Sequence, residues 1–182
     1  MQNKKSIRRG LIIVYYGDGK GKTEAAFGLG MRAAGHHFKV GVVQFIKSNS
    51  HSGEVRATKM LSPYMEVYLK GIGFVGIMND RRDREEHVSA AVEALAFAKR
   101  LASSGDYYVV ILDELLNAID WNLIKVEQVM DLLKAKNEKT SIVLTGVRAY
   151  PEIIEISDIV TEMKKVKHIY DLGYLAKLGI DF

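Results

Sequence analysis

Cysteine is absent from this sequence of 182 residues. Its absence excludes disulfides, thiolate zinc sites and cysteine nucleophiles, and it fits a reducing compartment. Long apolar runs are lacking too, because no window approaches the roughly 18 consecutive apolar residues of a transmembrane helix. The basic stretch 1–9 is followed by only a short apolar run, which is not the pattern of a secretory signal peptide. We therefore expect a cytoplasmic protein that does not enter a membrane.

A strong charge of one sign is also missing. The formal net charge is +4, and the basic residues form short separate groups that are not interleaved with aromatic side chains. This pattern disfavours nucleic acid as a partner and fits a site for a polyanionic small molecule. The hydrophobic content of 48% and charged content of 26% are those of a globular protein. We expect one domain over residues 10–182, preceded by a short basic tail at 1–9.

Short apolar runs alternate with segments of helical periodicity along most of the chain. The runs predict strands at 11–16, 40–46, 65–69, 107–112, 141–145 and 159–163. The periodic segments predict helices at 24–34, 80–101, 126–133 and 151–156. Strands that are apolar on both faces and alternate with helices indicate a parallel sheet covered on both sides. With the motif described next, the predicted fold class is α/β, a three-layer P-loop NTPase (RecA-like) fold with a mostly parallel sheet and helices on both faces.

A glycine-rich turn joins the first predicted strand to the first predicted helix. Its residues are Gly17, Asp18, Gly19, Lys20, Gly21, Lys22 and Thr23. Such a turn directs several backbone N–H groups to one point, and the helix dipole favours negative charge there. Lys22 adds a mobile positive charge, and the Thr23 hydroxyl is a ligand for Mg²⁺. The turn therefore predicts a nucleoside triphosphate site, and its position between strand and helix disfavours a chance glycine-rich turn.

The turn departs from the standard phosphate-binding loop in two ways. The pattern G-x-x-x-x-G-K-[ST] would place its first glycine at position 16, where this chain has Tyr16, so the loop is predicted to be tighter. Glu24 puts an additional carboxylate beside the site. The helix dipole stabilises that carboxylate, but it would repel a triphosphate if it pointed inward.

Two carboxylates, Asp113 and Glu114, end the predicted buried strand at 107–112. Ligands of open α/β sheets bind at the carboxyl edge of the strands, and a carboxylate there can hold Mg²⁺ directly or through water. We interpret both residues, with Thr23, as metal ligands; the alternative is a solvated strand end.

Other residues near predicted strand ends carry weaker signals. Phe74 lies among three glycines, which indicates a loop that presents the ring to something flat, although an ordinary core phenylalanine is equally compatible. Arg148 follows a strand end and either grips a phosphate or is exposed. The five histidines show no metal-ligand spacing and are interpreted as solvated or structural, and Trp121 as a packing residue. No convincing general base is recognisable, although phosphoryl transfer needs one or a water-orienting residue.

Several motifs occur together in a fixed order. The sequence GDGKGKTE at 17–24 is followed by VGVVQFIK at 40–47, GIGF at 71–74, LDE at 112–114, LTG at 144–146, IVTEM at 159–163, VKH at 166–168, GYLA at 173–176 and GIDF at 179–182. This set resembles the P-loop-type ATP:cob(I)alamin (corrinoid) adenosyltransferases, whose tight loop reads GNGKGKTT. The resemblance covers roughly residues 10–182.

The resemblance implies transfer of the 5′-deoxyadenosyl group of ATP to the cobalt of a reduced corrinoid, with release of triphosphate. Because cobalt(I) is itself a strong nucleophile, such a reaction needs no general base. By the same resemblance, residues 17–23 hold the triphosphate with Mg²⁺, Lys22 acts in catalysis, and Phe74 lies against the corrinoid and helps to keep its lower axial ligand away. It further implies ATP and a corrinoid as substrates, a homodimer, and an electron-donor protein such as a flavodoxin.

Four departures from the family pattern concern the corrinoid side more than the ATP side. Gly76 stands where the family usually has Trp, Glu24 where it has a second Thr, and Leu116 where it has Asn. The N-terminal extension that helps to cover the corrinoid in the family is reduced to about nine residues here. Two alternatives stay open: a P-loop ATPase or kinase, which would release orthophosphate or ADP, and a divergent paralogue that binds ATP or corrinoid without turnover.

Overall fold

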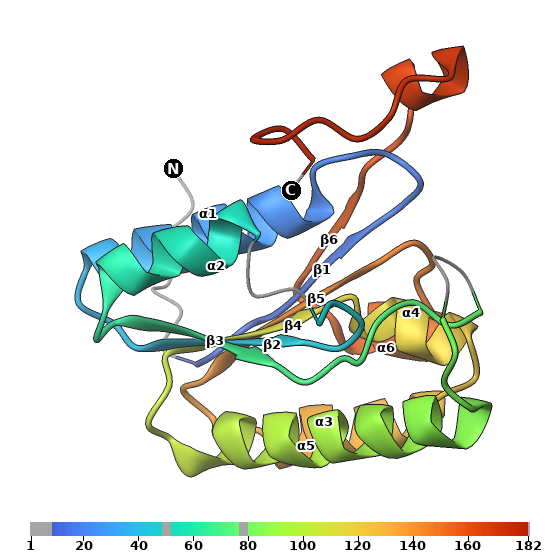
Figure 1. Ribbon diagram of the computed structural model, residues 1–182. Coiled ribbons are helices and arrows are strands. Elements are labelled where there is room, and N and C mark those ends of the chain that lie inside the picture. The colour runs from blue at the N-terminus through green and yellow to red at the C-terminus, as the bar shows by residue number, and fades with distance from the viewer. Residues whose placement is uncertain (1–8, 49–51, 77–79, 182) are drawn as a thin grey trace, which may run out of the picture.

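A parallel sheet of six strands forms the centre of the molecule (Figure 1). The computed structural model describes residues 9–48, 52–76 and 80–181. The strands are β1 (Ile12–Tyr16), β2 (Val40–Gln44), β3 (Met65–Leu69), β4 (Val109–Asp113), β5 (Ser141–Gly146) and β6 (Ile159–Glu162). Their order across the sheet is β3-β2-β4-β5-β1-β6, and every adjacent pair is parallel. The predicted parallel α/β sheet is confirmed.

Helices cover both faces of this sheet, as the three-layer prediction required (Figure 1). One face carries α1 (Lys22–Gly35) and α2 (Gly53–Thr58), with the 3₁₀ turn η1 (Lys59–Leu61). The other face carries α3 (Arg84–Ser104), α4 (Leu115–Asp120), α5 (Val126–Ala135) and α6 (Pro151–Ile156). A second 3₁₀ turn, η2 (Ile169–Leu172), lies in the C-terminal segment. Among the described residues, no helix is long and apolar enough to cross a bilayer.

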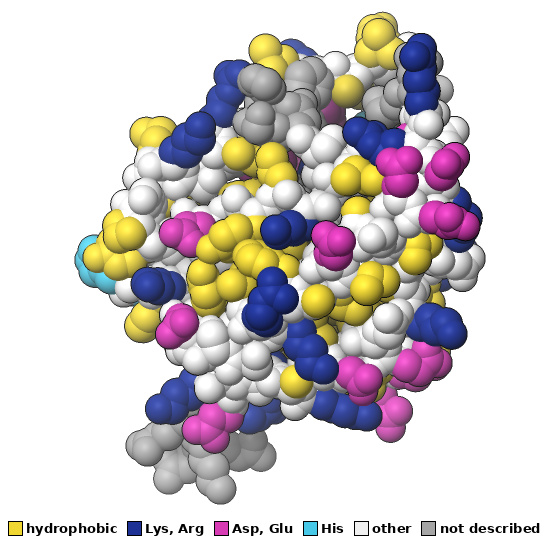
Figure 2. Space-filling view, turned by 60° about the horizontal axis from the view of Figure 1, so that its bottom comes forward, with side chains coloured by type: hydrophobic (Ala, Val, Ile, Leu, Met, Phe, Trp, Pro, Cys, Tyr) yellow, Lys and Arg dark blue, Asp and Glu magenta, His cyan; other side chains and the backbone are white. Residues whose placement is uncertain are grey.

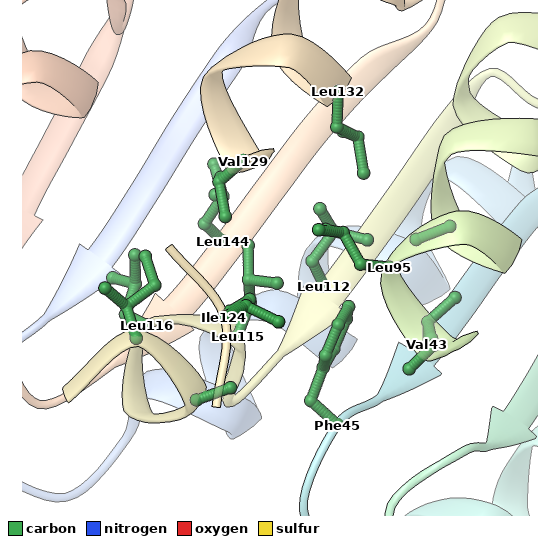
Figure 3. Packing of buried hydrophobic residues seen from close by; sticks show 14 of the residues in the cluster. Val43, Phe45, Leu95, Leu112, Leu115, Leu116, Ile124, Val129, Leu132 and Leu144 are labelled. Atoms are coloured by element: carbon green, nitrogen blue, oxygen red, sulfur yellow. The ribbon is translucent and has the colours of Figure 1, made fainter. Parts of the chain in front are cut away.

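Alternate residues of the central strands point to opposite faces and build two cores. Leu112 of β4 and Leu144 of β5 lie in one apolar cluster with Val129 and Leu132 of α5 (Figure 3). Ile111, the residue before Leu112 in β4, belongs to the cluster on the α1 face. Because the inner strands β2, β4 and β5 are buried on both faces, they read in sequence as nearly continuous apolar runs, whereas the edge strand β6 is exposed. This burial is why the inner strands were recognisable from the sequence.

The helix boundaries differ from prediction in the segment that precedes α3. The predicted helix starts at residue 80, but α3 begins at Arg84. Asp83 has an extended backbone (ψ 151°), and the Asp80 carboxylate accepts backbone N–H groups of its own loop, so residues 80–83 do not join the helix. The short helices α2 and α4 were not predicted. In α4, four of the six residues are buried, which conceals its helical periodicity.

The basic tail predicted at 1–9 lies almost wholly outside the described residues. Its last member, Arg9, donates from Nη1 to Oδ2 of Asp158 at 2.9 Å. Asp158 also accepts the backbone N–H of Ile12 at 2.9 Å and so links the start of β1 to the approach of β6.

Candidate active site

The phosphate loop lies at the carboxyl edge of the sheet, between β1 and α1. Tyr16 ends β1 and is paired with Gly146 and Glu162 of the neighbouring strands, so position 16 belongs to the sheet. Gly17 turns the chain instead, with φ of 122°, and Gly21 makes a second left-handed turn with φ of 116° just before α1. A left-handed backbone strains any residue with a Cβ. The tight loop predicted from the missing first glycine therefore starts one residue later than in the standard motif.

The loop is anchored to two neighbouring segments by its own backbone. The N–H of Gly17 donates to the carbonyl of Val147 at 3.0 Å, and that of Gly19 to the carbonyl of Met163 at 2.7 Å. A Cβ on Gly19 would lie 2.6 Å from the Met163 oxygen, so this close approach requires glycine. The N–H groups of the first turn of α1, which starts at Lys22, have no acceptors within the helix.

Lys22 folds back on the loop, where its Nζ donates to the carbonyl of Gly19 at 2.7 Å. The side chain is half-buried. Burial lowers its pKa, and the nearby carboxylates of Glu24, Asp18, Glu114 and Asp113 only partly oppose that shift. A phosphate group placed in the loop would replace one neutral carbonyl acceptor with a charged one, which is a stronger partner for the ammonium group.

Asp113 is the centre of the hydrogen-bond network beneath the loop. It is fully buried, and its Oδ1 accepts the Thr23 hydroxyl at 2.9 Å and the Thr145 hydroxyl at 2.8 Å. Its Oδ2 accepts the Gln44 amide at 2.9 Å and lies 3.7 Å from Nζ of Lys47. Three hydrogen-bond donors and one ammonium group thus hold one carboxylate directly below the phosphate loop, where Asp113 is paired with Gln44 in the register of β2 and β4.

Glu114 has a left-handed backbone (φ 62°) at the junction of β4 and α4, where its N–H donates to Oγ1 of Thr145 at 2.8 Å. Its Oε2 is buried and has no hydrogen-bond partner among the described residues. Burial and the adjacent Asp113 carboxylate raise the pKa of Glu114 to about 7. Such an unpartnered oxygen is costly unless it takes up a proton or a cation.

Lys47 faces both carboxylates and Glu54 of α2, whose Oε1 lies 3.9 Å from its Nζ. Burial lowers its pKa, but Asp113, Glu114 and Glu54 together outweigh burial and raise it. The two open hollows on either side of the loop have volumes of about 290 and 180 Å³. The smaller hollow is lined by residues of the loop together with Lys47, Glu54, Glu114 and Asp181.

Glu24 does not point unpaired into the site. Its Oε1 lies 2.7 Å from Nζ of Lys20, and the same ammonium group lies 3.2 Å from Oδ1 of Asp181. Burial raises the pKa of Glu24, but Lys20 and the helix backbone outweigh burial and lower it. The extra carboxylate is therefore ionised and neutralised within the loop.

The C-terminal segment lies beside the phosphate loop. Asp18 accepts the backbone N–H of Lys165 at 2.9 Å, and Asp181 reaches Lys20 as described above. The larger hollow is walled by the loop on one side and by Lys165, His168 and Tyr170 on the other. Figure 1 shows this segment leaving the body of the molecule above β6 and returning toward α1.

Phe74 lies away from this network, in the loop that follows β3 at the same sheet edge. The ring is half-buried against the apolar cluster beneath the sheet, with its centroid 6.2 Å from that of Trp121. Arg148 follows β5, but its Nε lies 3.5 Å from Oδ1 of Asp120, and its side chain is 76% exposed. Among the described residues, Arg148 has no hydrogen bond or ion pair with the phosphate loop. Leu116 is fully buried under β5.

Three polar residues around Asp113 lie in motifs quoted in the sequence analysis, but no function was assigned to them there. Gln44 is the last residue of β2, Thr145 is the next-to-last residue of β5, and Lys47 follows β2 closely. A sequence signal existed, because polar residues that end apolar strands converge at one edge of a parallel sheet. The specific partnership with Asp113 needed the strand order, which sequence spacing does not contain.

Comparison with known proteins identifies the family. The model of the family "ATP:corrinoid adenosyltransferase BtuR/CobO/CobP" matches residues 8–182. The chain is 38% identical to the corrinoid adenosyltransferase of Escherichia coli K12, covering 96% of this chain and 86% of that protein. It is 36% identical to the corrinoid adenosyltransferase CobA of Salmonella typhimurium, with the same coverage, and 36% identical to that of Pseudomonas aeruginosa, covering 96% and 84%. The chain belongs to the ATP:corrinoid adenosyltransferase family.

Proposed function

We propose that this protein transfers the 5′-deoxyadenosyl group of ATP to the cobalt(I) of a corrinoid and releases triphosphate, in cobalamin biosynthesis or salvage. The observation that carries the proposal is the phosphate loop whose Thr23 hydroxyl is bonded to the buried Asp113, in a chain that matches the family over residues 8–182. The lone pair of cobalt(I) forms the Co–C bond to the 5′ carbon, while the C–O bond to triphosphate breaks and its electrons stay on triphosphate. No proton has to be removed from the nucleophile.

The loop residues Gly17 to Thr23 bind the triphosphate in this proposal. Lys22 exchanges the Gly19 carbonyl for phosphate oxygens and neutralises charge that grows on the leaving triphosphate. The fixed N–H groups at the start of α1 also stabilise negative charge on the triphosphate. Arg148 is proposed as an additional phosphate ligand, which requires that it leave Asp120.

The donor set fits Mg²⁺. The Thr23 hydroxyl, the Asp113 carboxylate and the unpartnered Oε2 of Glu114 are oxygen ligands of the kind that Mg²⁺ prefers. The described residues contain no group of three or more His, Cys, Asp or Glu able to hold a metal by themselves, as expected for an ion that shares its coordination with phosphates and water. Bound Mg²⁺ would supply charge neutralisation to the triphosphate. Lys47 would neutralise the carboxylate charge that remains.

The corrinoid is proposed to lie against Phe74. The half-buried ring presents an apolar surface at the same sheet edge as the phosphate loop, which supports contact with a large flat ligand. Phe74 would then help to exclude the lower axial ligand, so that cobalt(II) is more easily reduced. Gly76 gives less bulk there than a Trp would, and a Cβ at this position would meet none of the described residues within 4 Å.

Further features follow from the same proposal. We infer one domain over residues 10–182, a homodimer, a cytoplasmic location and an electron-donor protein such as a flavodoxin. Nucleic acid is not expected as a partner; on the face of α3 and α5, Lys and Arg side chains are interspersed with acidic and apolar ones (Figure 2).

The test is an anaerobic assay with ATP, Mg²⁺ and chemically reduced cobalamin, in which the adenosylated corrinoid and the phosphate product are both quantified. Equimolar adenosylcobalamin and triphosphate are expected. Orthophosphate or ADP without adenosylation would instead indicate an ATPase or kinase, and binding without product with both complete and precursor corrinoids would indicate a non-catalytic paralogue. Phe74→Ala should impair adenosylation and leave ATP binding intact.

A further inference from the structure

A buried hydrogen bond joins the start of α3 to the loop before it. Nε2 of His87 lies 2.8 Å from Oδ2 of Asp80, and the two side chains are only 2% and 5% exposed. Because an ionised carboxylate only accepts hydrogen bonds, Nε2 carries the proton of this contact. Of the two alternatives that the sequence left for His87, solvated or structural, the structural one is therefore correct: His87 is buried and bonded to Asp80.

The Asp80 carboxylate also accepts backbone hydrogen bonds from the residues before and after it in the chain. Its Oδ2 also accepts the backbone N–H of Gly76 at 3.0 Å, and its Oδ1 accepts that of Arg82 at 3.2 Å. The Gly76 N–H contributes most to lowering the pKa of Asp80, followed by those of Arg82 and His87, against the opposing effect of burial. One ionised carboxylate therefore connects α3 to the backbone two residues beyond Phe74.

The residues that precede Phe74 in the chain are hydrogen-bonded to the backbone at the end of β2. The N–H of Gly71 donates to the carbonyl of Gln44 at 3.0 Å, and that of Gly73 to the carbonyl of Ile46 at 2.9 Å. A Cβ on Gly71 would lie 2.3 Å from the Ile46 oxygen, so the two backbones touch. Phe74 is thus bracketed by an anchor on the sheet at Gly73 and an anchor on Asp80 at Gly76.

We propose that His87 and Asp80 are positioning residues for the corrinoid reaction, which fix where the Phe74 ring meets the corrinoid. The proposal rests on the proposed function. Val75 packs against the apolar cluster, but Gly76 has a left-handed backbone (φ 69°) and no side chain, so no side-chain packing holds Gly76 itself in place. The buried pair supplies a polar anchor at the same point. Neither residue needs to touch substrate.

Two substitutions of His87 separate positioning from simple packing. His87→Leu fills the space but removes the N–H, whereas His87→Gln keeps an N–H near the place of Nε2. We expect His87→Leu to lose about 10- to 100-fold in kcat/KM for the corrinoid, the cost of misplacing a group by about 1 Å. ATP affinity should stay within about twofold, because the phosphate loop shares no bond with the pair, and His87→Gln should recover most of the loss. The exposed His36→Leu is the matched control.

Trp121 gives a readout that does not depend on turnover. It is the single tryptophan of the chain, its ring lies beside Phe74, and its carbonyl accepts Nη2 of Arg84 at 2.8 Å at the start of α3. His87→Leu should change the Trp121 emission and increase its quenching by acrylamide, and His87→Gln should not. If His87→Leu does not fold, Asp80→Asn, which keeps the size of the side chain, takes its place in both measurements.

Wild-type corrinoid kinetics and fluorescence in the folded His87→Leu variant would overturn the proposal, as would an equal loss of ATP and corrinoid affinity. If the unmodified protein forms no adenosylcorrinoid, the proposed function fails. The fluorescence comparison then decides by itself whether the pair positions the Phe74 loop.

Discussion

The hydroxyl of Thr23, the last residue of the phosphate loop, donates to Oδ1 of Asp113, the last residue of β4, at 2.9 Å. The two residues are 90 positions apart in sequence. In the sheet, β5 lies between β4, which ends at Asp113, and β1, the strand that leads into the phosphate loop. This bond brings a phosphate-side hydroxyl and a buried carboxylate to one point. Removal of the Thr23 hydroxyl alone therefore tests the role of this bond.

Thr23→Val should lower kcat/KM for ATP by about 100-fold or more, because it removes the hydroxyl but keeps the shape of the side chain. Thr23→Ser should retain most of the activity. Thr140→Val is the control, since the Thr140 hydroxyl donates to the carbonyl of Tyr107 at 2.7 Å at the opposite edge of the sheet. That variant is expected to unfold more easily, by about 1 kcal/mol, without a change in turnover. Steady-state triphosphate release and urea unfolding measure both effects.

Lys22→Ala should reduce triphosphate formation by about 100- to 1,000-fold, because the departing triphosphate loses its closest mobile cation. Lys22→Arg should recover part of the rate, since the charge is kept in a different geometry. Lys99→Ala, on the exposed face of α3, removes the same charge at a distance and should behave as wild type. Rapid-quench measurement of triphosphate is the assay, and an unimpaired Lys22→Ala variant would exclude the loop from the mechanism.

The stability of the protein should depend on pH through Glu114. Its pKa is raised from 4.5 to about 7 by burial and by Asp113. Below pH 4.5 the residue is protonated in both the folded and the unfolded state. Between about pH 4.5 and 7 the unfolded state releases its proton first, so the free energy of unfolding should fall as pH rises, on the order of 2 kcal/mol.

Urea unfolding at pH 5 and pH 8 without metal tests this dependence. Glu114→Gln should flatten the difference, and addition of Mg²⁺ with ATP should restore stability to the wild type at pH 8, because the cation replaces the proton at the buried oxygen. An unchanged pH dependence in Glu114→Gln would assign the effect to another group.

Gly19→Ala should weaken ATP binding by about tenfold, because its Cβ would lie 2.6 Å from the Met163 carbonyl oxygen and force the loop away from the C-terminal segment. Gly28→Ala in α1 is the matched control, since a Cβ there meets nothing within 4 Å. That control should leave ATP binding unchanged and add about 0.4–1 kcal/mol to the free energy of unfolding. Isothermal titration calorimetry with ATP compares the two variants.

Prediction succeeded where the sequence signal was local. Each predicted strand is present. In β2, β4 and β5 burial on both faces gives a nearly uninterrupted apolar run, and the loop at 17–23 follows β1 as its glycines required. The start of α3 was missed because Asp80 and Asp83 are ordinary polar residues whose bonds are not visible in a pattern. The short helix α4 was missed because its buried residues continue the apolar character of β4.

The sequence by itself determined the α/β class, the phosphate loop and the family resemblance, since each depends on residues close together in the chain or on a fixed order of motifs. The tertiary structure decided which side chains meet. Strand order places Gln44, Thr145 and Thr23 around Asp113, and the loop before α3 brings Asp80 to His87. The physical reason is that a hydrogen bond depends on distance and direction in space, and these follow from the arrangement of the strands rather than from separation along the chain.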